Sequence, residues 1–178
     1  MHTESEISGI PLAWREIVPD CLGLWVPADP DGVLEAMDDA ALDAAGERPP
    51  YFTALWPAGE ALARHVMDVG DLAARRVLDL GCGVGAVGLA AGVRGARVTF
   101  LDWEPRSLEI VALSAGRLGV EPTELVTGDW REPPALGPFD LVLAADVLYE
   151  AGNVEPVARF LARHLAPDGE AWLTCRPQ

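Results

Sequence analysis

Residues 76–85 read Arg-Val-Leu-Asp-Leu-Gly-Cys-Gly-Val-Gly, a short apolar run that passes directly into a glycine-rich stretch. The apolar run predicts a buried strand over 76–80, and the uncharged residues 86–93 that follow predict a helix. Glycine between them lets the backbone turn sharply and approach a ligand, because no Cβ atom stands in the way. This succession of strand, loop and helix predicts a nucleotide-binding loop.

The chain on both sides of this loop alternates between helix and strand patterns. The expected elements are a helix over 57–69, a strand over 97–101, a helix over 105–118, strands over 125–127 and 139–145, a helix over 154–165 and a strand over 171–175. Such alternation predicts a Rossmann-like, doubly wound α/β fold with a mostly parallel sheet covered on both faces. With a strand order of 3-2-1-4-5, the loops after Leu80 and Ala145 would face one crevice.

Length and charge restrict the class of protein. The 178 residues, half of them hydrophobic, are enough to bury one core, so a disordered chain is excluded. The net charge is −15, and an acidic chain disfavours nucleic acid, whose phosphates are bound by Lys and Arg. Residues 1–50 hold eleven acids and two arginines, a charge of −9. We interpret this excess as a solvated surface, and attraction for a basic substrate is the alternative.

Cysteine usage and hydropathy indicate the compartment. Cys21, Cys82 and Cys175 are odd in number and far apart, which disfavours a disulfide framework or a zinc site. The three histidines are too scattered for a metal cluster, so no metal is expected. The first residues lack the basic start of a signal peptide, and the longest uncharged run, 80–93, is shorter than the ~20 residues of a membrane span. We expect a soluble, cytoplasmic protein that is not associated with a membrane.

The composition changes near 48–50, Arg-Pro-Pro, where an acidic, proline-punctuated segment gives way to the regular alternation. We therefore expect an acidic N-terminal subdomain over 1–50 and a Rossmann-like domain over 51–178.

Two cofactors are compatible with the glycine loop. Gly83, Gly85 and Gly88 spell the G-x-G-x-x-G pattern of dinucleotide sites, which is a weak signal by itself. The strand, however, carries an acid, Asp79, just before the loop. A carboxylate at this place suits an ammonium group and would repel a pyrophosphate. S-adenosylmethionine has an ammonium and a sulfonium and no phosphate, so Asp79 favours it over NAD.

Asp79, Gly81, Gly83 and Gly85 match in full the acid-x-Gly-x-Gly-x-Gly motif of the class I (seven-strand) S-adenosylmethionine-dependent methyltransferases, which this chain resembles. The resemblance implies that these residues bind S-adenosylmethionine, with S-adenosylhomocysteine as the product. Cys82, inside the loop, is expected at the same cofactor, although a small side chain that fits a crowded turn is the simpler interpretation.

Two further pairs follow the second and third strands. Asp102 lies about twenty residues beyond the loop, where a carboxylate can accept both ribose hydroxyls; capping of the helix at Pro105 is the alternative. Trp103 offers a plane for ribose or adenine, or else a core residue. The resemblance assigns Asp129 and Trp130 to adenine, with Asp129 accepting from the adenine amino group. Turn chemistry is the alternative for Asp129.

An acid and a phenol, Asp146 and Tyr149, come just past the strand that ends at Ala145, and both are expected to face the glycine loop. This Asp-x-x-Tyr resembles the protein-lysine methyltransferase branch of the seven-strand enzymes. A second signature covers residues 50–64, which read Pro-Tyr-Phe-Thr-Ala-Leu-Trp-Pro-Ala-Gly-Glu-Ala-Leu-Ala-Arg. This stretch looks like the electron-transfer-flavoprotein β-subunit lysine methyltransferase family and its bacterial relatives. The resemblance covers residues 17–178 and implies methyl transfer to a protein lysine.

Methyl transfer is an in-line displacement at the sulfonium carbon, so the protein must align a lone pair, exclude water and handle one proton. Asp146 would hold and orient the incoming ammonium, and Tyr149 would supply a hydroxyl or an aromatic wall; capping and core packing are the respective alternatives. Trp56 would close over the methionine end of the cofactor or anchor the core. Ala145 would line the cofactor site.

Two other functions remain open from the sequence: a small-molecule amine methyltransferase, and a cofactor-binding protein without turnover. The resemblance also implies an antiparallel strand pair after the fifth strand, and the chain ends at 176–178 without one. We therefore expect the fifth strand to lie at a sheet edge, covered by the N-terminal segment or another subunit, or exposed by truncation. The sequence does not determine the oligomeric state.

Overall fold

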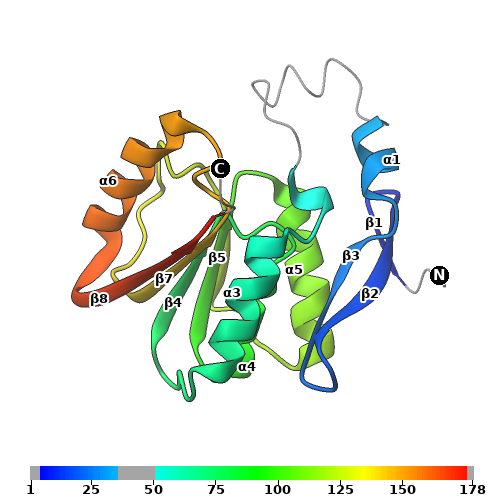
Figure 1. Ribbon diagram of the computed structural model, residues 1–178, viewed down its shortest axis with the longest axis horizontal. Helices are drawn as coiled ribbons and strands as arrows, with labels where there is room; N and C mark the ends of the chain where they lie inside the picture. The colour runs from blue at the N-terminus through cyan, green and yellow to red at the C-terminus, as the bar shows by residue number, and fades with distance from the viewer. Residues whose placement is uncertain (1–4, 36–50, 176–178) are drawn as a thin grey trace.

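The computed structural model describes residues 5–35 and 51–175 (Figure 1). Its larger sheet has five parallel strands in the order β6-β5-β4-β7-β8, which confirms the expected 3-2-1-4-5 winding. The strands are β4 (Arg76–Leu80), β5 (Arg97–Asp102), β6 (Glu124–Thr127), β7 (Phe139–Ala145) and β8 (Leu165–Thr174). The switch point of this order lies between β4 and β7, where open α/β sheets bind ligands.

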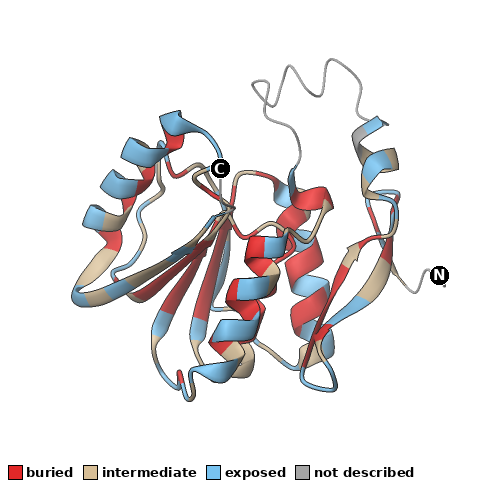
Figure 2. Cartoon of the chain, in the orientation of Figure 1, coloured by how far each residue is buried: buried red, intermediate tan, exposed pale blue. Residues whose placement is uncertain are grey.

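Helices cover both faces of this sheet, as Figure 1 shows. On one face lie α3 (Pro57–Asp68), α4 (Ala86–Val93) and α5 (Pro105–Leu118), and on the other lies α6 (Val154–His164). Side chains alternate along each strand, so Val77 joins the buried cluster under α3 to α5, whereas Leu78 joins the cluster under α6. Figure 2 shows burial concentrated along the central strands and the inward helix faces.

Strand β8 begins earlier than the expected 171–175. Phe139 pairs with Leu165, and the next pair is Leu141 with Glu170, so the register shifts between these two points. The hydrophobic part of the strand, which the pattern identified, is the regular part of the ladder. Within the described residues β8 forms an edge of the sheet.

A three-stranded antiparallel sheet precedes the Rossmann-like part and was not expected. It comprises β1 (Ser5–Ile7), β2 (Ile10–Val18) and β3 (Leu22–Pro27), followed by α1 (Pro30–Glu35). Its buried residues Leu12 and Leu24 share one hydrophobic cluster with the larger sheet. The Trp25 backbone N–H donates to Ser114 Oγ on α5 at 2.9 Å. The boundary expected at 48–50 lies outside the described residues.

Two short 3-10 helices, η1 (Tyr51–Thr53) and η2 (Ala151–Asn153), lie near the end of the larger sheet where β4 and β7 end. No helix in residues 5–35 and 51–175 is long and apolar enough to cross a membrane. The same ranges contain no cluster of three or more His, Cys, Asp or Glu side chains that could hold a metal ion.

Candidate active site

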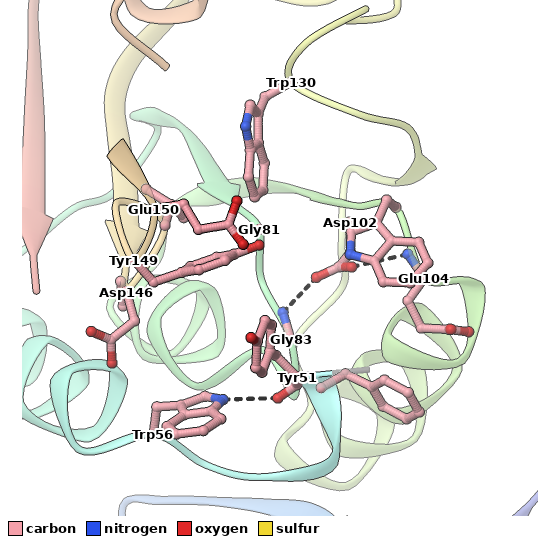
Figure 3. Close-up of a pocket in the computed structure, with 14 residues that line it drawn as sticks. Tyr51, Trp56, Gly81, Gly83, Asp102, Glu104, Trp130, Asp146, Tyr149 and Glu150 are labelled. Carbon is pink, nitrogen blue, oxygen red and sulfur yellow. Dashed lines mark hydrogen bonds between the residues drawn. The ribbon is translucent and has the colours of Figure 1, made fainter. Parts of the chain in front are cut away.

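A cavity of about 290 Å³ opens where β4 and β7 end, at the switch point of the sheet (Figure 3). Its volume is at the lower end of the ~300–1,000 Å³ of small-molecule pockets. Nine of the thirteen residues expected from the sequence line it: Trp56, Gly81, Gly83, Asp102, Trp103, Trp130, Ala145, Asp146 and Tyr149. Asp79 and Cys82 line a smaller cavity of about 50 Å³, which also borders Trp56 and Gly81. Gly85 and Asp129 line neither.

The glycine loop forms one wall of the cavity because three of its residues adopt positive φ. These φ values are 65° at Gly81, 52° at Gly83 and 82° at Gly85, all in the region that side chains disfavour. A Cβ on Gly81 would lie 2.9 Å from Trp130 Cζ3, whereas one on Gly83 would meet nothing closer than 4.0 Å. Gly83 therefore leaves open space on the cavity side of the loop.

Gly85 has a structural position rather than a place in the cavity wall. A Cβ there would stand 2.6 Å from Val111 Cγ2 on α5. The residue also serves as the N-cap of α4 in a left-handed conformation. Glycine at this position lets α4 start close against α5, which fixes the direction of the loop.

Asp102 ties the glycine loop to the end of β5. Its Oδ2 accepts a hydrogen bond from the Gly83 backbone N–H at 2.8 Å, and its Oδ1 accepts one from the Glu104 N–H at 3.0 Å (Figure 3). Burial raises the pKa of this carboxyl to about 6, although the backbone hydrogen bonds oppose the rise. The alternative that Asp102 caps α5 is wrong: Glu104 is the N-cap and accepts from the Arg106 N–H.

Asp79 lies beneath the loop, 2% exposed, and reaches the smaller cavity rather than the larger one. Its Oδ2 accepts from the Gly88 N–H at 2.8 Å. Burial, and to a smaller extent the charge of Asp102, raises its pKa to about 8. An acid in this state keeps its proton at neutral pH, and a ligand ammonium beside it would stabilise the ionised form.

Cys82 behaves as a packing side chain. It is 9% exposed, and burial together with the Asp102 and Asp79 carboxylates raises the pKa of its thiol well above the usual value. A thiol that stays protonated is a poor nucleophile. The structure therefore supports the simpler interpretation of a small residue in a crowded turn.

The Asp129–Trp130 pair separates into two roles. Trp130 is buried against Gly81 and lines the cavity, and its Nε1–H meets no hydrogen-bond acceptor among the described residues. Asp129 lies outside the cavity lining and accepts from the Arg131 N–H at 2.8 Å, which is the turn chemistry considered as its alternative.

The wall opposite the glycine loop comes from the end of β7. Asp146 has φ of 54°, an uncommon value for a residue with a side chain, and its backbone N–H donates to the Thr174 carbonyl on β8 at 2.8 Å. Residues other than glycine in the left-handed region cluster at functional sites. The ring of Tyr149 meets that of Tyr51 edge to face, with centroids 5.0 Å apart. Partial burial raises the pKa of the Tyr149 hydroxyl.

Five lining residues were not among the expected site residues: Tyr51, Phe52, Glu104, Val147 and Glu150. Tyr51 and Phe52 come from η1, before α3, and were quoted only as part of a family signature. Glu104 precedes Pro105, which is a recognisable N-cap position, and its carboxylate is held by Arg106 at 2.8 Å. The guanidinium of Arg106 lies over the Phe52 ring at 5.0 Å.

The charge of the lining distinguishes the two cofactors considered from the sequence. The larger cavity is lined by four carboxylates, Asp102, Glu104, Asp146 and Glu150, and by no basic side chain of the described residues. Such a lining repels a pyrophosphate and attracts a cation. The open face of the glycine loop and the unpartnered Trp130 Nε1–H add room and a buried donor for a ligand. These features fit S-adenosylmethionine.

Comparisons with known proteins identify the family of the chain. Residues 77–169 match a family described as a methyltransferase domain. The electron transfer flavoprotein beta subunit lysine methyltransferase of Xenopus laevis is 31% identical over 125 residues, 67% of this chain and 49% of that protein. A protein N-lysine methyltransferase of Danio rerio is 32% identical over 130 residues, 68% of this chain and 59% of that protein. The chain spans about half the length of the curated relatives it matches.

Among solved structures, one similar to this chain is coclaurine N-methyltransferase bound to N-methylheliamine and S-adenosylhomocysteine. The TM-score is 0.56 and the sequence identity is 24%, and the match covers 65% of this chain and 35% of that chain. This likeness concerns the fold. The chain therefore belongs to the methyltransferase domain family, with the Rossmann-like fold of the class I enzymes and S-adenosylmethionine as its cofactor.

Proposed function

We propose that this chain is an N-methyltransferase that transfers a methyl group from S-adenosylmethionine to a lysine side chain of a protein. One observation carries the proposal: a single acidic cavity has the glycine loop on one side and Asp146 and Tyr149 on the other. The names of the two curated relatives support the lysine assignment, because each is a lysine methyltransferase.

The walls of the two cavities suit different parts of the cofactor. Asp102 would accept from the ribose hydroxyls, and Trp103 and Trp130 would border the adenine. Asp79 and Trp56 line the smaller cavity and would hold the methionine end, where the cofactor carries its ammonium. When bound, the cofactor supplies a methyl group on a sulfonium whose leaving group is a neutral thioether.

The residues on the β7 side would prepare the acceptor. Lysine enters as an ammonium with a reference pKa of about 10.4, and it must lose a proton before its lone pair can attack. Asp146 would hold this ammonium, orient the nitrogen and take up the proton that the nitrogen loses. The rings of Tyr51, Trp56 and Tyr149 would keep water away from the reacting nitrogen.

The absence of lysine from this chain sharpens the assay, because no lysine automethylation can add to the signal. The protein is incubated with methyl-labelled S-adenosylmethionine and, in separate reactions, with small amines or with a peptide array in which each lysine peptide has a partner with arginine or norleucine instead. Label confined to lysine peptides supports the proposal. Label on small amines alone supports a small-molecule methyltransferase and contradicts the lysine assignment.

Asp146→Asn tests the role of the β7 wall with little backbone disturbance, since Asn also tolerates positive φ. We expect methyl transfer to fall by about 100-fold or more, as for loss of a group that handles the proton, with unchanged cofactor affinity. Asp129→Asn is the matched control, because Asp129 lies outside the cavity lining. Unchanged turnover in Asp146→Asn would remove Asp146 from the mechanism.

A further inference from the structure

Three aromatic rings meet at the mouth of the larger cavity. Tyr51 stands between the other two: its ring centroid lies 5.0 Å from that of Tyr149 and 5.8 Å from that of Trp56. Tyr51 and Tyr149 are 40% and 36% exposed, so a ligand from solvent can reach both rings. We call Tyr51, Trp56 and Tyr149 the aromatic corner.

The rings of the aromatic corner are set at steep angles to one another. The planes of Tyr51 and Trp56 are 75° apart, and those of Tyr51 and Tyr149 are 65° apart. In Figure 3 these rings border three sides of one part of the cavity, and the Asp146 side chain lies across from Tyr51. Steeply inclined rings cannot stack on a flat group together, but they can surround a compact, roughly spherical one.

The charge around the corner is negative. Asp146 and Glu150 line the same cavity, and the faces of aromatic rings carry negative electrostatic potential. Ring faces together with carboxylates attract a cation without requiring directional hydrogen bonds. An alkylammonium group has the compact shape and the charge that such a corner recognises, whereas imidazole and guanidinium groups are planar.

We propose that the aromatic corner is the subsite for an alkylammonium group of the acceptor, and that Tyr51 is its specificity-determining residue. This inference rests on the proposed function for the origin of the ammonium, and it concerns how that group is held. A methylated ammonium is larger and more weakly hydrated than a primary one, so the corner also accommodates the acceptor after it has received a methyl group.

Tyr51 can be tested without disturbing the loop that carries it. The Trp56 Nε1–H donates to the backbone carbonyl of Tyr51 at 2.8 Å, so a side-chain substitution leaves this acceptor in place. Tyr51→Leu removes the ring, and Tyr51→Phe restores a ring without the hydroxyl. Leu125→Ala on β6 is a control of matched exposure, because Leu125 is 39% exposed and lies outside the cavity lining.

The probes are choline and neohexanol, its uncharged isostere with a tert-butyl group in place of trimethylammonium. Binding of each to the full chain is measured by ligand-observed NMR, with and without S-adenosylhomocysteine. We expect choline to bind more tightly than neohexanol. Tyr51→Leu should weaken choline binding by about 2- to 30-fold, as for loss of one cation–π contact, and Tyr51→Phe and Leu125→Ala should not.

Equal affinity for the two probes, no choline binding, or no effect of Tyr51→Leu would overturn the proposal. The sulfonium of the cofactor is a second cation that the aromatic corner could contact. The affinity for S-adenosylmethionine divided by that for S-adenosylhomocysteine distinguishes this contact from an acceptor subsite, because only the former compound carries the sulfonium. A fall in that ratio in Tyr51→Leu would assign the corner to the cofactor and overturn the acceptor subsite. If choline binds as expected but neither cofactor form binds, the subsite stands and the proposed function fails.

Discussion

Gly85→Ala should destabilise the protein through two separate effects that the structure shows. The first is the left-handed backbone, with φ of 82°, which costs a residue with a Cβ about 1–2 kcal/mol. The second is the contact at 2.6 Å between the new Cβ and Val111 Cγ2, and forced overpacking of this kind costs about 1–3 kcal/mol. Together they predict a loss of about 2–5 kcal/mol in the free energy of unfolding.

The assay is urea and thermal unfolding followed by circular dichroism. For a chain of this size each kcal/mol moves Tm by about 2–4 °C, so Gly85→Ala should melt roughly 5–20 °C below the parent. Gly116→Ala is the matched control, since this glycine lies inside α5 and a Cβ added to it would meet nothing within 4 Å. This substitution should stabilise the protein by up to about 1 kcal/mol, because Ala favours the helix over Gly.

A second variant separates the two effects. Val111→Ala in the Gly85→Ala background relieves the contact and leaves the backbone strain, so the two changes should be non-additive. If Gly85→Ala unfolds within about 0.5 kcal/mol of the parent, which is the usual range for a surface substitution, the tight approach of α4 to α5 is contradicted.

Because burial raises the pKa of Asp79 to about 8, a ligand ammonium that binds beside Asp79 should make this carboxyl ionise and release a proton near pH 7. Calorimetry in buffers of different ionisation enthalpy should detect the released proton, and Asp79→Asn should abolish the release. Asp102→Asn should weaken S-adenosylmethionine binding by about 10- to 100-fold through loss of charge-assisted hydrogen bonds, whereas Asp129→Asn should leave the affinity unchanged. Equal affinities of the two variants would refute the assignment of Asp102 to the ribose. Cys82 should react with a thiol reagent at pH 8 far more slowly than the exposed Cys21, as mass spectrometry of the modified peptides would show, and equal rates would contradict its buried, raised-pKa state.

The Rossmann-like part was predictable because its central strands β4, β5 and β7 are mostly apolar and α5 has clear boundary signals. Pro105 opens α5 and Gly119 closes it with φ of 69°, as the sequence indicates. The N-terminal sheet was missed although β3 is itself an apolar run, because β2, the strand that pairs with it, does not show that pattern. In β2 the exposed Arg15 and Glu16 follow a partly buried Trp14, so charge interrupts the alternation that identifies a strand.

The cavity lining was predictable where an acid lies at or just past the end of a strand in the parallel sheet, as for Asp102 and Asp146. It was less predictable where packing decides. The sequence motif treats Gly81, Gly83 and Gly85 alike, yet only Gly81 and Gly83 line the larger cavity, since the start of α4 turns Gly85 toward α5. Tyr51 reaches the cavity only because η1 lies against the end of the sheet, a tertiary contact that local pattern does not encode.

The most direct test of the central claim is a calorimetric titration of the purified chain with S-adenosylmethionine and, separately, with NAD. The acidic lining of the larger cavity predicts that S-adenosylmethionine binds and that NAD does not bind. Binding of NAD, or of neither compound, would contradict the cofactor assignment on which the proposed methyl transfer depends.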